Sequence, residues 1–266
     1  MSSASLDELR SLALDAARAA SQLLVSGRPD TLQYDTKSSP TDVVTEMDRK
    51  AETLLVEQLL GARSDDGVLG EEGAARPGSS GVRWVIDPID GTVNYLYGIP
   101  HWAVCIAAEV DGKVEVGVVI NPTTGDEYAA TRGQGATQND VELRVSDLTE
   151  LSQALIGTGF AYSPSVRTEQ ATAIADVIPK VRDIRREGSA ALDLCAVAAG
   201  RLDGYFERTL QPWDLAAAGL IAQEAGAVVA GLDGQPAGPD IVIAANAALF
   251  PELHDLLGPL HPQLRA

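Results

Sequence analysis

Basic residues are scarce in this sequence. It has 20 Lys and Arg against 38 Asp and Glu, which gives a formal net charge of −18. A nucleic-acid surface needs clustered Lys and Arg, so the composition argues against one. The excess of acids either serves solubility or includes a concave cluster that binds divalent cations.

Cysteines and long apolar runs are also few. Cys105 and Cys195 each lie in an apolar run and no C-x-x-C occurs, so we expect two reduced core residues and no structural zinc. No apolar run approaches the ~18 residues needed to span a bilayer. The start, MSSASLDELR, lacks a basic segment followed by an apolar core. We therefore predict a cytoplasmic protein without a signal peptide or a membrane partner.

Two common hydrolytic chemistries lack their motifs. The histidines are His101, His254 and His261, and neither H-E-x-x-H nor G-x-S-x-G occurs. Zinc hydrolysis and a serine triad therefore find no support. We expect His101 to be a loop residue rather than a catalyst, and TRGQGA to be a turn rather than a dinucleotide loop.

The first part of the chain predicts two helices followed by strands. Residues 6–25 have an apolar face, with Ser5 and Glu8 placed as a capping box, and Thr45 opens a second helix with Asp48 at its capping position. A turn-rich segment, TKSSPTDVVT, separates them. The strands VLGEE, VRWVID, AVCIAAEV and KVEVGVVI follow, and the Asp111–Gly112 pair predicts a hairpin between the last two.

From about residue 150, short strands alternate with helices. This alternation predicts layered α/β packing. The sequence contains no repeat and no long linker. We therefore expect one catalytic unit with two lobes, 1–145 and 146–266, that share a core.

Carboxylates follow several of the predicted elements. Glu71 and Glu72 follow VLG, Asp87 and Asp90 follow WVI, and Asp214 follows Trp213. Taken singly, each is an ordinary solvated cap. Pro88 fixes a backbone angle, however, so we expect a rigid turn that holds Asp87 and Asp90 together. Like charges held close repel unless cations neutralise them, and hard oxygen ligands suit Mg²⁺.

Gly91 and Thr92 directly follow this pair. If a helix starts here, its free N–H groups favour an anion such as phosphate, although an ordinary helix cap gives the same pattern. Phosphatases that form an aspartyl-phosphate have one residue between their two Asp. Here Pro88 and Ile89 both intervene, so we expect water as the nucleophile, activated by metal.

These motifs together resemble a known family. DPIDGTVN after GEEG, with WDLAAAGLIAQEAGA downstream, is similar to the inositol monophosphatase family of Mg²⁺-dependent, lithium-sensitive phosphatases. The resemblance extends from KSSPTDVVTEMD to IVIAANAAL and is closest to the bacterial inositol-1-phosphate phosphatases. It implies an αβαβα sandwich, of the inositol monophosphatase and fructose-1,6-bisphosphatase type, and a homodimer.

The resemblance also implies roles for individual residues. One Mg²⁺ would be held by Glu71, Asp87 and the carbonyl of Ile89. A second would be held by Asp87, Asp90 and Asp214, and a third, weaker ion would contact Glu71 through waters. The catalytic group would be Glu71, Thr92 and Asp48, which activate and orient the attacking water. Substrate would be bound by Asp90, Gly91, Thr92, Gly188, Ala190, Glu207 and Asp214, with Lys37 at the rim.

The leading hypothesis is thus Mg²⁺-dependent hydrolysis of myo-inositol 1-phosphate. The nearest alternatives use the same metal site on histidinol phosphate, fructose 1,6-bisphosphate or 3′-phosphoadenosine 5′-phosphate. Such bisphosphates and nucleotides need extra cationic or stacking groups. The segments around Glu207 and Arg208 favour a neutral polyol. A non-catalytic, metal-binding regulatory protein is the alternative from another class.

Overall fold

The computed structural model describes residues 5–260, so His261 and part of the segment assessed for a signal peptide lie outside it. The α-helices are α1 (Leu6–Ser26), α2 (Glu46–Ala62), α3 (Thr92–Tyr97), α4 (Pro164–Val177), α5 (Ala190–Ala198), α6 (Pro212–Glu224) and α7 (Phe250–Leu257). Short 3₁₀ turns cover Leu151–Gln153, Ile178–Lys180 and Gly258–Leu260.

The strands form three sheets. A small antiparallel pair joins β1 (Tyr34–Thr36) and β2 (Val43–Thr45). The large sheet has the order β10-β9-β8-β7-β6-β5-β3-β4, and its strands are β3 (Gly67–Gly70), β4 (Ala75–Arg76), β5 (Val82–Asp90), β6 (Ala103–Val110), β7 (Lys113–Asn121), β8 (Asp126–Thr131), β9 (Ala136–Gln138) and β10 (Val141–Glu142). The second sheet has the order β12-β11-β13-β15-β14, with β11 (Leu155–Thr158), β12 (Asp183–Arg185), β13 (Gly204–Glu207), β14 (Ala227–Ala230) and β15 (Val242–Asn246).

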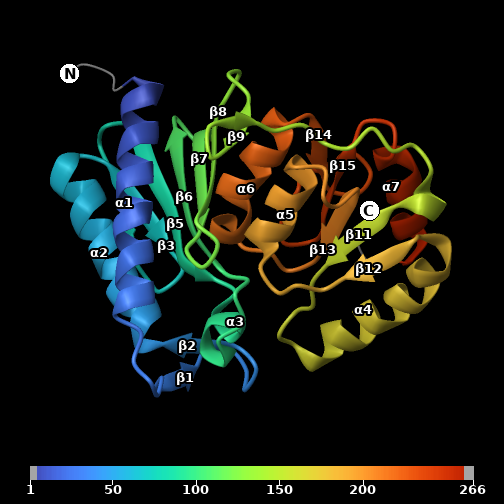
Figure 1. Ribbon diagram of the computed structural model, residues 1–266, viewed down its shortest axis with the longest axis horizontal. Helices are drawn as coiled ribbons and strands as arrows, with labels where there is room; N and C mark the ends of the chain where they lie inside the picture. The colour runs from blue at the N-terminus through green and yellow to red at the C-terminus, as the bar shows by residue number, and fades with distance from the viewer. Residues whose placement is uncertain (1–4, 261–266) are drawn as a thin grey trace.

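Helices and sheets alternate in five layers (Figure 1). Helices α1 and α2 cover one face of the large sheet, and α5 and α6 cover the other. The five-stranded sheet packs on the far side of α5 and α6, and α4 and α7 lie outside it. The predicted αβαβα sandwich is confirmed.

Both faces of the large sheet are buried, which explains the continuous apolar runs of its central strands. Side chains alternate between faces along a strand. On β5, Trp84 and Ile86 pack toward α1 and α2, whereas Val85 packs toward α5 and α6. Beyond the exposed Arg83 near its start, this strand is buried on both faces until it reaches the pocket described below.

The local signals of the sequence form the structures predicted from them. Ser5 with Glu8 and Thr45 with Asp48 make complete capping boxes at the starts of α1 and α2. Asp111 and Gly112 have φ of 50° and 81° in the β6–β7 hairpin. The segment TKSSPTDVVT is ordered further than predicted, because its end pairs as β2 with β1.

The rigid turn expected at Asp87–Asp90 is wrong in detail. Strand β5 continues through Asp90, and its register against β6 shifts between these two residues as a β-bulge. Pro88 has no N–H for the ladder, and the N–H of Ile89 donates to Asp87 Oδ1 at 2.9 Å instead. The bulge brings both carboxylates to one end of the strand.

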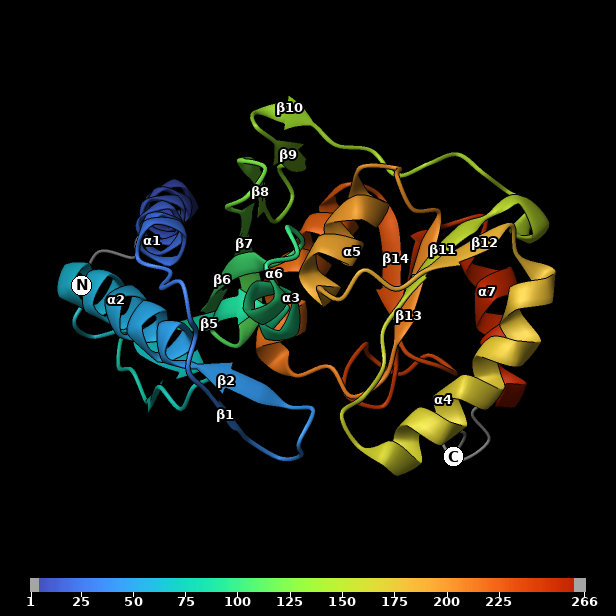
Figure 2. The same ribbon diagram turned by 60° about the horizontal axis from the view of Figure 1, so that its bottom comes forward.

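Helices α5 and α6 join the two halves of the chain. The large sheet is built from residues 67–142 and the second sheet from residues 155–246, and the C-terminal half supplies the middle helical layer. Figure 2 shows α5 and α6 between the two sheets. We keep the two-lobe division, 1–145 and 146–266, as a proposal with this layer as the shared core.

Cys105 and Cys195 are buried and unbonded, as predicted. Within residues 5–260 no helix combines the length and the apolar character that crossing a membrane requires.

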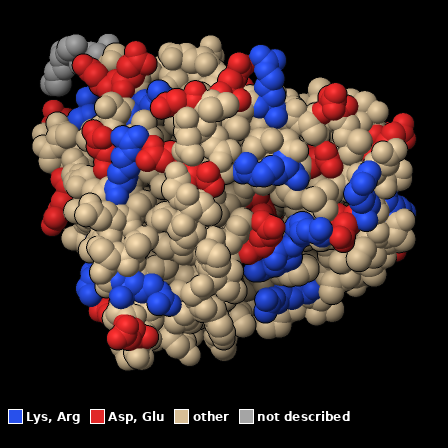
Figure 3. Space-filling model, viewed as in Figure 1, with Lys and Arg blue, Asp and Glu red and all other residues tan. Residues whose placement is uncertain are grey.

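On the face viewed in Figure 3, Lys and Arg side chains are dispersed and alternate with Asp and Glu. The acidic character of the chain is therefore not restricted to the pocket.

Candidate active site

A cavity of about 420 Å³ opens between the two halves of the chain. Every predicted site residue except Asp48 lines it, together with residues that were not predicted, among them Tyr162, Arg186 and Asp193. Asp48 is fully buried behind Thr92. The structure thus brings together segments that are more than one hundred residues apart in the sequence.

Three carboxylates form the polar floor of this cavity. Asp87 and Asp90 come from the end of β5 and Asp214 from the first turn of α6, and one oxygen of each lies within 4.8 Å of the others. Among the described residues no Lys or Arg forms an ion pair with any of them. Burial, followed by the charges of neighbouring acids, raises the pKa of Asp87 and of Asp214 well above the ordinary value.

Two of these acids are held by helix N-termini. Asp214 Oδ2 accepts the N–H of Gln211 at 2.7 Å as part of the α6 capping box. Asp90 Oδ2 accepts the Ser189 hydroxyl and the Ala191 N–H, the latter at 2.8 Å, at the start of α5. In each case one oxygen is fixed by the helix, so the other is free to bind an ion.

Glu71 stands beside this group on the loop after β3. Lys37 Nζ lies 2.8 Å from Glu71 Oε1 and 2.6 Å from Glu72 Oε1, so Lys37 neutralises this side of the pocket. Burial raises the pKa of Glu72 to about 7 despite this lysine. Glu52, a buried residue of α2 that was not predicted, accepts the N–H groups of Glu72 and Ala74 at 2.8 and 2.9 Å and so fixes the loop.

Thr92 and Asp48 form a buried pair. The Thr92 hydroxyl lies 3.1 Å from Asp48 Oδ1 and 3.1 Å from the carbonyl oxygen of Ile89. Asp48 Oδ2 accepts the hydroxyl and the N–H of Thr45 at 2.5 and 2.8 Å. Burial is the main reason that the pKa of Asp48 rises to about 6.

Gly91 is required by the backbone at this point. Its φ is +95°, and a Cβ there would lie 3.1 Å from the Gly188 carbonyl and 3.2 Å from the His101 carbonyl. Helix α3 begins directly after it, at Thr92, so the condition set by the sequence for an anion site is met. The first N–H groups of a helix have no intrahelical acceptor, so they are available to an anion.

The far end of the pocket is formed by Glu207, Arg186 and the segment before α5. Glu207 accepts the Tyr205 hydroxyl, and burial raises its pKa to about 7 although Arg186 and this hydrogen bond oppose the rise. Arg208, which the sequence favoured for this pocket, instead pairs with Glu169 at 2.8 Å and does not line it. Arg186 lines this end of the pocket instead, in addition to Lys37 at the other side.

The donor set fits a hard divalent cation. Buried carboxylates with raised pKa values and no basic counter-ion leave negative charge that an ion would neutralise. Oxygen ligands at this spacing suit Mg²⁺, which takes carboxylates, carbonyls and water. Ile89 lines the same space, and its carbonyl oxygen lies 3.1 Å from the Thr92 hydroxyl.

Comparisons with known proteins identify relatives over nearly the whole chain. The model of the family described as "Inositol monophosphatase family" matches residues 5–261. The "Inositol-1-monophosphatase SuhB" of Mycobacterium tuberculosis is 50% identical over 221 residues, which cover 79% of this chain and 76% of that protein. The "Nus factor SuhB" of Pasteurella multocida is 41% identical over 233 residues, covering 86% of this chain and 87% of that one.

Solved structures also match over nearly the whole chain. The extragenic suppressor protein suhB of Bartonella henselae superposes with a TM-score of 0.87 at 39% sequence identity. The match covers 94% of this chain and 98% of that one. The likeness therefore includes both sheets and the helical layer between them.

Proposed function

The chain belongs to the inositol monophosphatase family and is a phosphatase, and we propose that it hydrolyses myo-inositol 1-phosphate to myo-inositol and phosphate with Mg²⁺. The main support for this proposal is the group of acids at the floor of the pocket. There Asp87, Asp90 and Asp214 converge within 4.8 Å and have no ion pair to Lys or Arg among the described residues. Holding three buried acids together is unfavourable unless the site binds cations.

Two or three Mg²⁺ ions would be held by the carboxylates of Glu71, Asp87, Asp90 and Asp214 and by the carbonyl of Ile89. When bound, Mg²⁺ lowers the pKa of water and neutralises charge on phosphoryl oxygens. The net charge of −18 would repel a phosphate ester, so the same ions are needed for substrate to enter.

The chain itself positions the attacking water. The Thr92 hydroxyl has one proton, which it donates to Asp48 or to the carbonyl of Ile89, each 3.1 Å away. Its lone pairs can then accept a hydrogen bond from the water. Glu71, held from the other side by Lys37, accepts one proton as the water attacks in line with the leaving oxygen. The other proton stays on the phosphate, and the leaving oxygen takes up a proton from solvent.

The backbone N–H groups of Gly91 and Thr92, at the start of α3, bind the phosphate. Gly91 is required there because a Cβ would lie 3.1 Å from the carbonyl oxygen of Gly188. At the other end, Glu207 accepts hydrogen bonds from ring hydroxyls, and Asp90 and Asp214 contribute where their oxygens face the ring. Gly188 and Ala190 leave space for the ring.

Arg186 is a reason to assay the alternative substrates as well. A cation in the pocket offers a partner to a second anionic group, as in fructose 1,6-bisphosphate or 3′-phosphoadenosine 5′-phosphate. Histidinol phosphate uses the same metal site without that group. Inositol phosphate remains the leading substrate because the Mycobacterium tuberculosis relative is named for it.

Phosphate release tests the proposal across a panel of these monophosphates and bisphosphates, with and without Mg²⁺. We expect the highest kcat/KM for inositol 1-phosphate and no turnover after chelation. Asp90→Asn should lower kcat at least ~10²-fold, because it removes a charge that binds the ions. The matched control is Asp176→Asn, at an exposed position of α4, and its kcat should equal that of the unsubstituted protein. Normal turnover by Asp90→Asn would remove the metal assignment, and preference for another ester would change only the substrate.

We also propose inhibition by Li⁺, a homodimer and a cytoplasmic location, as the resemblance and the sequence predict. A second function is favoured by one finding, the name Nus factor on the Pasteurella multocida relative. A regulatory function of that kind, exercised through the protein surface, should survive Asp90→Asn. Its loss together with turnover would instead tie it to the metal site.

A further inference from the structure

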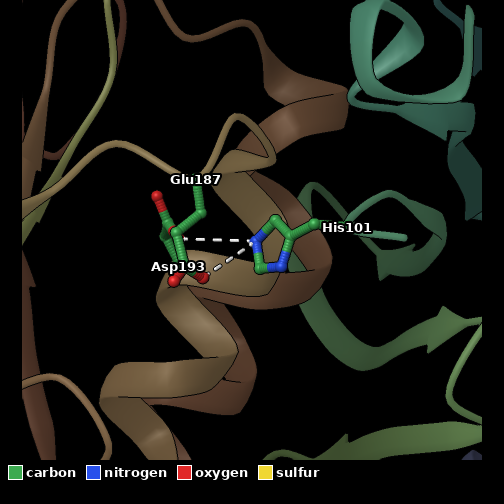
Figure 4. A group of neighbouring side chains, drawn as sticks. All are labelled: His101, Glu187 and Asp193. Atoms are coloured by element: carbon green, nitrogen blue, oxygen red, sulfur yellow. Dashed lines mark ion pairs between the residues drawn. The ribbon is translucent and has the colours of Figure 1, made fainter. Parts of the chain in front are cut away.

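His101, Glu187 and Asp193 form a second group of potential ligands next to the pocket. His101 comes from the loop between α3 and β6, Glu187 precedes α5, and Asp193 lies in the first turn of α5. One atom from each lies within 4.8 Å of the others. Figure 4 shows the same ring nitrogen of His101 directed at both carboxylates.

The distances in this group are too long for good hydrogen bonds. His101 Nε2 lies 3.4 Å from Glu187 Oε2 and 3.6 Å from Asp193 Oδ1. An N–H···O bond is ordinarily about 2.7–3.2 Å long. Ligands about 2.05 Å from a tetrahedral ion lie about 3.3 Å apart, which is close to the observed spacing.

Two buried atoms of this group have no hydrogen-bond partner. They are His101 Nε2 and Asp193 Oδ1, and the side chain of Asp193 is 2% exposed. A buried carboxylate oxygen without a partner is costly. A single imidazole proton could satisfy only one of the two carboxylates, whereas a cation between them satisfies all three atoms.

The backbone around the group is fixed by Asn94. Its Nδ2 donates to the carbonyl of His101 at 2.6 Å and to the carbonyl of Glu187 at 2.7 Å. The loop before β6 and the loop before α5 are therefore held in register without an ion. Such support of the ligands is what a metal site requires.

We propose that His101, Glu187 and Asp193 bind one Zn²⁺ ion, separate from the Mg²⁺ site, that links the two halves of the chain beside the pocket. One imidazole nitrogen and two carboxylates are a borderline ligand set, which zinc accepts more readily than Mg²⁺ does. The fourth position is open to water or to a ligand in the pocket.

Metal counting after equilibrium dialysis tests this site. The protein is stripped with a chelator and dialysed against Zn²⁺ in excess Mg²⁺, and bound zinc is measured by atomic absorption. We expect His101→Gln to bind one zinc fewer per chain than the unsubstituted protein. His254→Gln is the matched control: His254 also lies beside two acids, but its Nε2 already accepts the Asp233 N–H at 3.0 Å, so it should lose none.

Glu187→Gln provides an independent arm, because its side chain is 44% exposed and its replacement should not disturb folding. We expect it to weaken the zinc affinity of this site at least ~10-fold. Equal zinc counts and affinities in the unsubstituted protein, His101→Gln and Glu187→Gln would overturn the proposal. So would zinc that disappears only in Asp214→Asn, since that zinc would occupy the acid cluster.

Discussion

At the scale of single residues, the hydroxyl of Thr92 is the group whose role can be isolated most cleanly. Thr92→Val keeps the shape of the side chain but removes the contact to Asp48 at 3.1 Å and the acceptor for water. We expect kcat to fall ~10²–10³-fold, since groups that orient the reacting water contribute on that order. Phosphate release at saturating Mg²⁺ measures it.

Thr92→Ser is the control, because it retains the hydroxyl. We expect its kcat within ~10-fold of the unsubstituted protein. If Val and Ser lower kcat equally, the methyl packing of Thr92 matters rather than its hydroxyl, and the proposed role in orienting water is wrong.

The sequence predicted the members of the pocket better than their supports. The Asp-Pro-Ile-Asp spacing indicated Asp87 and Asp90, whereas Asp214 was assigned to the same site only by the family resemblance. Glu52 was missed, although it follows Asp48 by four residues on the buried face of α2, where an acid is unusual. Arg186 was missed because nothing local indicates which arginine of RDIRREG faces the pocket.

At the scale of elements, α6 must pack closely on the large sheet to deliver Asp214. A Cβ at Gly117 of β7 would lie 2.5 Å from the carbonyl oxygen of Ala217, one turn beyond Asp214. Gly117→Ala therefore has to displace α6. We expect about 1–3 kcal/mol lower free energy of unfolding, and several-fold more Mg²⁺ for half-maximal activity.

Gly61→Ala is the matched control. Nothing lies within 4 Å of a Cβ at Gly61, which is in the last turn of α2. We expect this change to raise stability by about 0.5–1 kcal/mol and to leave the Mg²⁺ requirement unaltered. Denaturant melts and Mg²⁺ titrations of activity check both, and a Gly117→Ala protein with an unchanged Mg²⁺ requirement would contradict the role given to α6.

Long elements with caps could be predicted from the sequence, and irregular ones could not. Helices α1 and α2 followed from capping boxes and periodicity. The bulge in β5 did not, because proline is compatible with a turn and with a strand bulge, and only pairing with β6 decides between them. The small β1–β2 pair is too short for a pattern.

At the scale of the whole molecule, the buried acids make stability depend on pH. Burial raises the pKa of Asp90 to about 6, from an ordinary 3.8, and that of Glu207 to about 7, from 4.5. The folded protein therefore binds protons more tightly than the unfolded chain. This tighter proton binding adds to the free energy of unfolding. The addition is fully present below the pKa values of these acids in the unfolded chain, and it is lost as pH rises through about 6–7.

We expect the metal-free protein to melt at a lower temperature at about pH 8 than at about pH 5. Mg²⁺ should raise the melting temperature strongly at the higher pH, where the acids are ionised, and much less at the lower one. Calorimetry with and without Mg²⁺ measures this. Identical melting temperatures of the metal-free protein at the two pH values would mean that burial does not raise the pKa values of these acids.

The convergence of the two halves is the feature that local patterns do not contain. Alternating strands and helices predicted layers, but the order of the five layers came from the family resemblance alone. That order depends on packing between segments about one hundred residues apart, such as Asp90 with Ser189 and Ala191.

The most direct test of the central claim is a crystal structure with Mn²⁺, which prefers the same ligands as Mg²⁺ and scatters anomalously. We predict an anomalous peak about 2.1 Å from oxygens of Asp87, Asp90 and Asp214. A map with no peak among these three side chains would contradict the account.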